Sequence, residues 1–205
     1  MNKVVELVNI WARYEEENPD LSIEDFCVKY LAESAKKAPQ SHGLEVSING
    51  MLGSLVGRLG AYTQMYSKKA LDKLHLNNVE DWVYLIVLNE MGTPKKSELI
   101  YQMLSEFPSG IDVIKRLLKN GFAEEFPDET DKRSKRLKIT ELGKEVVIKG
   151  YPAMKKVGEM AFGTLSDIEK ITLLNILRKL EKFHDGQYKN IRTAEFEEAY
   201  LLLTE

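Results

Sequence analysis

Hydrophobic residues along most of the chain recur every three or four positions, which is the spacing of amphipathic helices. The first two such segments cover residues 2–17 and 22–37, and Pro19 in the break N-P-D separates them. A polar hinge, K-K-A-P-Q-S-H-G, then leads to a periodic stretch over residues 44–74. The pattern therefore predicts a helical extension followed by one long helix.

The long helix carries an apolar stripe and a row of glycines. The glycines stand at positions 50, 53, 57 and 60, and each costs a helix about 1 kcal/mol relative to alanine. Four of them in one helix indicate that another backbone approaches this face, and the alternative is a weakly stable or kinked helix. Arg58 and the polar flanks argue against a membrane span. The stripe consists of Leu52, Leu55, Val56, Leu59 and Tyr62.

Three shorter helical segments follow. The first covers residues 79–90, with Asn78 as its N-cap and Gly92 as its terminator. The second is expected to begin with Thr93 as cap and Pro94 at the first helical position.

The third segment is expected to open near Ser109 and to end at Gly121. Beyond it, residues 122–126 and 136–140 alternate apolar with polar positions, which is typical of strands. The intervening P-D-E-T-D-K-R-S-K has turn chemistry and no apolar side chain apart from proline. These features predict a β-hairpin with a long polar tip.

Helical spacing returns over residues 141–160, 166–183 and 193–203. The sequence S-D-I-E at residues 166–169 has the form of a capping box. The predicted fold is therefore mostly α with a small β-hairpin, an α+β chain. Helix, helix, helix, hairpin, helix is the order of a winged helix-turn-helix, in which one helix enters the major groove of DNA and the hairpin lies against its backbone.

Charge strengthens this interpretation. The formal net charge is -3, yet five basic residues stand within residues 132–138. A hairpin projects such charge to where phosphates can meet it. The alternative is a solvated hairpin whose charges keep the protein in solution. Because three helices precede the hairpin, contact with double-stranded DNA is favoured.

Composition excludes several other classes. The chain is 43% hydrophobic and 30% charged, as in ordinary globular proteins, and it shows no membrane span or secretion signal, so we expect it in the cytoplasm. Cys27 is the single cysteine, which excludes a disulfide framework and leaves a plain apolar role or a redox role. No H-E-x-x-H, glycine-rich phosphate cradle or G-x-S-x-G turn occurs, so we expect no catalytic residues, no metal and no bound cofactor.

The hairpin sequence also resembles a known family. D-K-R followed by S-K-R-L-K-I-T-E-L-G, residues 131–143, is similar to the wing of the multiple antibiotic resistance regulator (MarR) family, whose pattern is D-x-R, a short basic gap and L-T-x-x-G. S-E-L-I-Y-Q-M-L resembles the first helix of its helix-turn-helix, and D-V-I-K-R-L-L-K-N-G-F-A-E-E-F resembles its recognition helix. T-L-S-D-I-E-K-I-T-L-L-N-I-L-R-K-L-E-K-F resembles its C-terminal dimerisation helix, so the resemblance covers residues 44–183.

The resemblance implies a homodimeric transcriptional regulator, most often a repressor, that binds a pseudo-palindromic operator. Many members release DNA when a small aromatic molecule binds between the dimerisation and DNA-binding regions. Residues 1–43 are then an N-terminal helical extension, residues 44–76 and 144–205 the dimerisation region, and residues 77–143 the DNA-binding domain. The interface or the core would contain Leu173, Leu174, Leu177 and Leu180.

The resemblance also assigns roles in the wing. Arg133 is expected to enter the minor groove, a narrow negative groove that suits arginine. Asp131 is expected to orient basic groups by ion pairing, and its alternative role is to form the turn of its own loop. The expected phosphate contacts are Lys132, Lys135 and Arg136.

On the recognition helix, Ser109 is a candidate contact and equally a candidate N-cap. The expected backbone contacts are Lys115, Arg116 and Lys119. Asp112 departs from the family, because a carboxylate repels phosphates. This departure, together with the acidic residues of the first wing strand, motivates a rival hypothesis, a winged-helix module that binds another protein and no DNA. Aromatic residues that either line an effector pocket or lie in the core are Trp11, Tyr62, Tyr66, Trp82 and Tyr84.

Overall fold

The computed structural model describes residues 2–35, 47–129, 131 and 133–204. The predicted hinge at residues 36–43, the predicted start of the long helix and the candidate phosphate contact Lys132 lie outside the described residues. The chain divides into two compact units, Met1–Ser54 and Leu55–Glu205.

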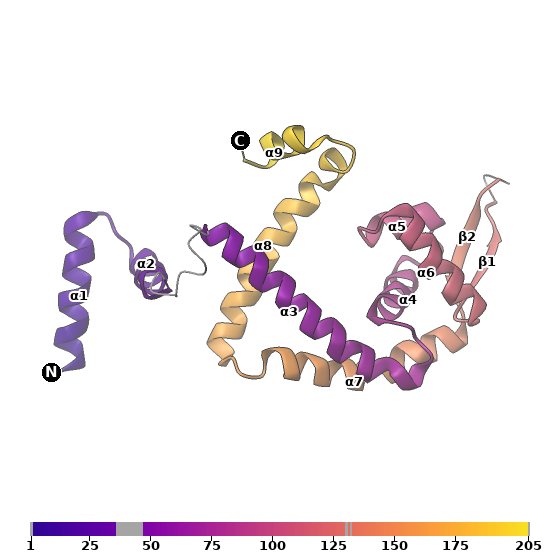
Figure 1. Cartoon of the computed structure of the whole chain (residues 1–205), viewed down its shortest axis with the longest axis horizontal. Helices are drawn as coiled ribbons and strands as arrows, with labels where there is room; N and C mark the ends of the chain where they lie inside the picture. The colour runs from indigo at the N-terminus through magenta and orange to yellow at the C-terminus, as the bar shows by residue number, and fades with distance from the viewer. Residues whose placement is uncertain (1, 36–46, 130, 132, 205) are drawn as a thin grey trace. The chain divides into compact units, whose positions relative to one another are not determined.

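The first unit contains the two predicted helices of the extension, α1 (Lys3–Glu17) and α2 (Ile23–Ala35) (Figure 1). Phe26 of α2 is buried, and its ring centroid lies 4.9 Å from that of Trp11 and 5.3 Å from that of Tyr14. An aromatic cluster therefore joins the two helices. Trp11 belongs to this cluster.

The second unit contains the winged helix-turn-helix (Figure 1). Three helices, a two-stranded antiparallel hairpin and a further helix follow one another, which confirms the predicted order within a mostly helical chain. The elements from the long helix onward are α3 (Ile48–Leu71), the 3-10 helix η1 (Asp72–Leu74), α4 (Val79–Met91), α5 (Lys96–Gln102), α6 (Phe107–Lys119), β1 (Ala123–Pro127), β2 (Lys135–Ile139), α7 (Glu141–Phe162), α8 (Asp167–Ile191) and α9 (Phe196–Thr204).

Helix α4 contacts α5, α6, α7 and β2, which explains why its sequence is apolar on several faces. Tyr84 at its middle is fully buried, and its hydroxyl donates to Oγ of Ser105 at 2.9 Å. Burial raises the pKa of Tyr84. The core around it contains Leu85, Leu88, Leu99, Ile100, Val113, Ile114, Leu117, Leu137, Val146 and Val147.

Two glycines allow helices to approach this core closely. A Cβ on Gly110 of α6 would lie 2.6 Å from Cγ1 of Ile100 and 2.9 Å from the hydroxyl of Tyr84. A Cβ on Gly150 of α7 would collide with the indole ring of Trp82. Trp82 and Tyr84 therefore pack in the core, which was the alternative to lining an effector pocket.

The wing begins where α6 ends. Gly121 has a φ of 71°, as the predicted terminator requires, and β1 then pairs with β2 in the register Ala123↔Ile139 and Pro127↔Lys135. Each strand lies within one residue of its predicted range.

The T-x-x-G part of the wing motif joins the hairpin to α7. The hydroxyl of Thr140 donates to the carbonyl of Gly121 at 2.7 Å and accepts from the amide of Gly143 at 3.1 Å, so Thr140 is the N-cap of α7. A side chain on Gly143 would collide with the carbonyl of Phe122. Threonine and glycine are both needed for this tight joint.

Other predicted caps are confirmed. Asn78 accepts from the amide of Asp81 at 3.0 Å, and Gly92 ends α4 with a φ of 75°. The capping box of α8 is formed by Ser166 and Glu169. Serine hydrogen bonding lowers the pKa of Glu169.

The predicted start of α5 at Thr93 and Pro94 is wrong. The helix begins at Lys96, and the Lys95 amide donates to the Glu98 carboxylate at 2.8 Å. Residues 93–95 are instead attached to the wing, because the carbonyl of Pro94 accepts from the amide of Leu137 at 2.9 Å.

Helix α6 begins at Phe107, so Ser109 lies inside its first turn and is not its cap. Helix α8 continues to Ile191, past the predicted end at Phe183. At Gly57 and Gly60 of α3 an added Cβ would meet no atom within 4 Å, so the predicted close approach is not made within the described chain. No described helix has both the length and the apolarity that crossing a membrane requires.

Candidate nucleic-acid interface

Three parts of the second unit form the candidate interface: α6, the first turn of α5 and the tip of the β1–β2 hairpin. Figure 1 shows the hairpin extending past α5 at its tip. Arg133 near the turn is exposed, so its side chain is accessible to a partner that lies against α5 and α6.

Helix α6 brings two lysines to its surface. Lys115 and Lys119 are both exposed and one helical turn apart, so they lie on one face. The Nζ of Lys115 is 3.2 Å from Oδ1 of Asp112, an exposed pair of the kind that contributes less than about 1 kcal/mol. An approaching phosphate can replace Asp112 as the partner of Lys115. Ser109 is exposed one turn before Asp112.

Arg116 points to the core side of the same helix. Its Nη2 and Nε donate to Oδ1 of Asp81 at 2.6 Å and 3.2 Å, and the Asp81 side chain is 1% exposed. This hydrogen bond raises the pKa of Arg116. Arg116 therefore ties α6 to the start of α4, and contact with DNA stays a prediction for the part of its side chain that remains exposed.

Arg136 has a similar structural role in the wing. Its Nε is 2.7 Å from Oδ2 of Asp128, whose side chain is 1% exposed, and its Nη1 donates to the carbonyl of Thr93 at 2.7 Å. The Nζ of Lys95 lies 3.6 Å from the same carboxylate oxygen. The guanidinium of Arg136 on β2 thus joins Asp128, which follows β1, to the residues before α5.

Glu125 of β1 holds two further lysines. It forms ion pairs with Lys96 and, at 3.0 Å, with Lys135. The hydrogen bond from Lys96 and, after it, the one from Lys135 lower the pKa of Glu125 despite its partial burial. This carboxylate keeps both ammonium groups beside the wing.

Asp131 forms the turn at the tip. Its Oδ1 accepts from the amide of Arg133 at 3.1 Å, and its Oδ2 accepts from the hydroxyl of Ser134 at 2.6 Å. The hydroxyl bond is the main reason why the pKa of Asp131 is lowered. These hydrogen bonds support the alternative role of Asp131, which is to form the turn of its own loop. The Nζ of Lys95, 3.9 Å from Oδ2 of Asp131, adds an ion pair.

The cations meet around a hollow of about 350 Å³ between the first turn of α5 and the wing tip. Arg133 and Lys135 come from the wing, Lys96 is the first residue of α5, and Lys95 is its N-cap. Sequence reasoning missed Lys95 and Lys96, although they stand next to each other in P-K-K-S. The two adjacent lysines can be seen in the sequence. Their position beside the wing, however, depends on contacts between residues that are far apart in the sequence.

In the part of the chain that the structure describes, no group of three or more histidine, cysteine, aspartate or glutamate side chains could hold a metal ion. Cys27 is exposed on α2, in the first unit.

No protein-family model matches the chain. Among curated proteins, the HTH-type transcriptional repressor NicR of Pseudomonas putida is 24% identical over 151 residues, which are 72% of this chain and 94% of NicR. NicR is a transcriptional regulator, which agrees with the prediction that this chain is not an enzyme.

Solved structures give the same picture. A mutant of MarR from E. coli in complex with operator DNA has a TM-score of 0.59 and 19% identity, over 63% of this chain and 92% of MarR. BpsR of Bordetella bronchiseptica, whose DNA binding is regulated by 6-hydroxynicotinic acid, has a TM-score of 0.59 and 20% identity, over 64% of this chain and 98% of BpsR. The resemblance to the MarR family is confirmed at the level of the fold, and the fold of this chain is that of the MarR-type winged helix-turn-helix regulators.

Proposed function

We propose that this protein is a DNA-binding transcriptional regulator that acts as a homodimer on a pseudo-palindromic operator. The observation that carries the proposal is the hollow where Lys95, Lys96, Arg133 and Lys135 converge. Several cations around one concave surface suit a phosphate backbone, whose neutralisation supplies much of the affinity of DNA-binding proteins. The net charge of -3 does not oppose this, because the local field decides contact within about 10 Å.

In this arrangement α6 lies in the major groove and the wing lies over the adjacent minor groove. Ser109, Lys115 and Lys119 then face the duplex from α6. Arg133, exposed at the wing tip, enters the minor groove. Lys135 meets phosphates beside it.

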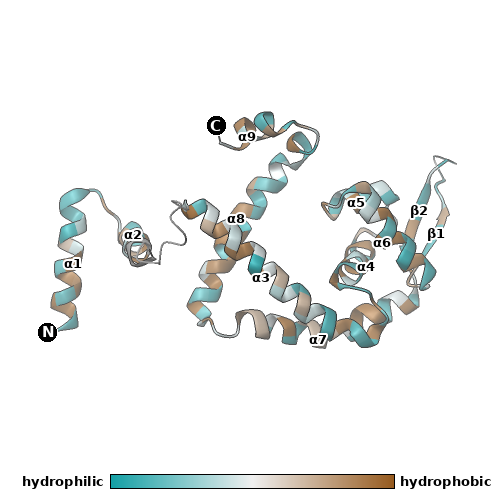
Figure 2. Ribbon diagram, viewed as in Figure 1, coloured by the Kyte–Doolittle hydropathy of each residue, from teal (hydrophilic) through white to brown (hydrophobic). Residues whose placement is uncertain are grey.

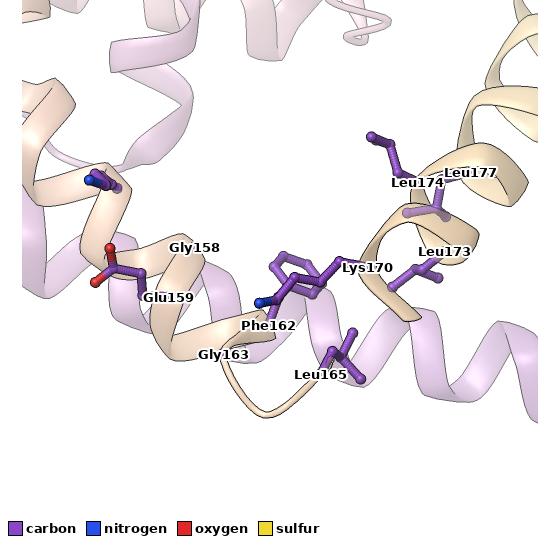
Figure 3. A pocket seen from close by; sticks show the side chains of 10 residues that line it. Gly158, Glu159, Phe162, Gly163, Leu165, Lys170, Leu173, Leu174 and Leu177 are labelled. Atoms are coloured by element: carbon purple, nitrogen blue, oxygen red, sulfur yellow. The ribbon is translucent and has the colours of Figure 1, made fainter. Parts of the chain in front are cut away.

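The apolar surface of α8 supports the homodimer. Figure 2 shows hydrophobic residues along α3 and α8. In α8 several of these residues are exposed to solvent, with Ile168 at 78% and Ile171 at 60% exposure. Near the start of α8 a hollow of about 520 Å³ opens between it and the end of α7 (Figure 3). Its apolar lining includes Phe162, Leu165, Leu173, Leu174 and Leu177. A second copy of the chain, which carries the same apolar faces, would cover this surface.

A small aromatic effector is the second part of the proposal. A cavity of about 590 Å³ lies between α3, α4 and α7, with Gln64 and Thr63 on one side and Met154 and Phe162 on the other. This size suits a drug-sized molecule. The aromatic residues predicted as its lining are not there, since Trp82 and Tyr84 lie in the core and Tyr62 stacks on Tyr66 at 6.4 Å. The regulation of BpsR by an aromatic acid supports the proposal by analogy.

Repression is the proposed sign of regulation, because NicR is a repressor and a dimer covering an operator excludes other proteins from it. The rival hypothesis of a winged-helix module without DNA binding is not favoured, because the relatives are transcriptional regulators. It predicts no steep dependence of DNA affinity on salt.

The experiment is selection of an operator from random duplexes by the full chain, followed by titration at several salt concentrations. We expect Arg133→Ala to weaken operator binding by roughly tenfold to a hundredfold and to reduce the salt slope by about 1. Lys149→Ala, on the exposed side of α7 and outside the interface, is the matched control and should leave affinity unchanged. A wild-type chain that selects no duplex would overturn the proposal.

A further inference from the structure

The end of α8 contacts the helix-turn-helix through three side chains. Tyr188 on α8 lies with its ring centroid 5.0 Å from that of Tyr101 on α5, at an interplanar angle of 57°. The guanidinium carbon of Arg192 lies 5.4 Å from the Tyr101 ring centroid and 6.0 Å from that of Tyr188. We refer to these three residues as the tyrosine–arginine cluster.

The spacing of residues at the end of α8 brings this cluster together. Tyr188 and Arg192 are four residues apart and therefore on one face at the end of α8. Arg192 is the C-cap, where a cation is favoured by the helix dipole. Apolar residues recur at helical spacing in α8 only as far as Phe183. The remaining turns of the helix, up to Ile191, carry the contact with α5 and do not extend the apolar face.

The contact is local rather than a broad interface. A hollow of about 440 Å³ lies beside it, bordered by Met91, Phe107 and Arg192. Tyr101 itself remains 38% exposed. A small contact of this kind does not decide whether the domain folds, but it can decide at which angle α5 and α6 stand relative to α8.

We propose that the tyrosine–arginine cluster positions the helix-turn-helix for operator binding by fixing α5 to the end of α8. The proposal rests on the proposed function, because α8 belongs to the dimerisation region and α6 contacts DNA. A homodimer reads two half-sites about one helical turn apart, so both helix-turn-helix units must stand at the right separation at once. The cluster raises the fraction of free dimers that already have this geometry.

The size of the effect follows from the contact. An exposed cation–π contact corresponds to roughly a twofold to fivefold change in an equilibrium. Two protomers act together, so loss of the cluster should weaken operator binding by about fourfold to twenty-five-fold. The cluster touches no DNA in this arrangement, so Tyr101, Tyr188 and Arg192 are positioning residues.

The experiment compares duplexes in which the half-sites stand at the selected spacing or one and two base pairs further apart. The full-length Arg192→Ala protein should lose affinity at the selected spacing and should discriminate less between spacings. Tyr188→Leu should behave in the same way, whereas Tyr188→Phe, which keeps the ring face, should bind as wild type. Lys189→Ala removes a cation from the same turn of α8 and is the matched control for non-specific loss of charge.

The outcomes separate the two proposals. If wild type binds no duplex, the proposed function fails. If wild type binds and Arg192→Ala keeps both its affinity and its spacing profile, the positioning role alone is overturned. Equal weakening at every spacing, or equal weakening by Lys189→Ala, also overturns it, because such a change reports lost stability or lost charge rather than lost geometry.

Discussion

Arg133 and Arg136 stand three positions apart in the wing, yet their surroundings give them different roles. The Arg136 side chain binds a buried carboxylate and a backbone carbonyl. In Arg133 the backbone amide donates to Asp131 in the turn, and the side chain is exposed at the tip. Charge alone therefore does not identify a DNA contact. The partner that the fold places beside each cation decides between a structural and a binding role.

Replacing Arg136 tests the structural role. Arg136→Ala should lower the free energy of unfolding by about 2–3 kcal/mol, because it leaves the buried carboxylate of Asp128 with a weaker partner in Lys95. Urea unfolding followed by circular dichroism measures this difference. Lys138→Ala, exposed on the same strand, is the control and should change stability by less than about 0.5 kcal/mol.

A double variant sharpens the test. Adding Asp128→Asn to Arg136→Ala removes the buried charge and should recover part of the lost stability. Equal stabilities of Arg136→Ala and Lys138→Ala would show that Arg136 does not hold the wing to the residues before α5.

At the scale of elements, the helices and strands were predictable because their signals are local. Apolar spacing located each helix, Asn78 and Ser166 marked two starts, and Gly121 marked the end of α6. The start of α5 was missed because Pro94 bonds to β2, more than forty residues away in the sequence. The end of α8 was missed because the apolar pattern stops at Phe183 while the helical backbone continues.

The close approach of α6 to α4 and α5 gives a prediction at this scale. Gly110→Ala should destabilise the protein by about 1–3 kcal/mol, because the new methyl group meets Ile100 and the hydroxyl of Tyr84. Thermal unfolding gives the comparison. The control is Gly186→Ala on α8, where nothing lies within 4 Å, and it should stabilise by up to about 1 kcal/mol.

The decisive result is that Gly110→Ala lowers the stability of the protein while Gly186→Ala raises it. Both remove a helical glycine, so they share the gain in helix propensity and differ only in the space around the new Cβ. If Gly110→Ala also stabilised the protein, the packing of the helix-turn-helix around Tyr84 would be looser than its distances indicate.

At the scale of the whole molecule, the candidate interface could be located from sequence but its chemistry could not. The wing cluster stood out by charge, and Arg133 and Lys119 were recognisable without coordinates. The carboxylates that hold Arg116 and Arg136 are 35 and eight positions away in the sequence, and only the fold brings them together. The same holds for Lys95 and Lys96, which reach the wing through the irregular start of α5.

The apolar face of α8 gives the last prediction. Leu177 lines the hollow near the end of α7 and is 42% exposed, so Leu177→Glu should leave the protomer folded but place a charge in the proposed dimer interface. Analytical ultracentrifugation should show a homodimer for wild type and a monomer for the variant at the same concentration. Lys179→Glu, exposed on the same helix, should remain dimeric.

Loss of the dimer should also act on DNA binding. Two linked half-site contacts bind more tightly than either alone, by roughly a hundredfold to ten-thousandfold, so Leu177→Glu should lose operator affinity by a factor in this range. Binding to a duplex with a single half-site should change little, because each winged helix-turn-helix keeps its own surface. A monomeric wild-type protein would overturn the homodimer, whereas a Leu177→Glu variant that stays dimeric would place the second copy elsewhere than on α8.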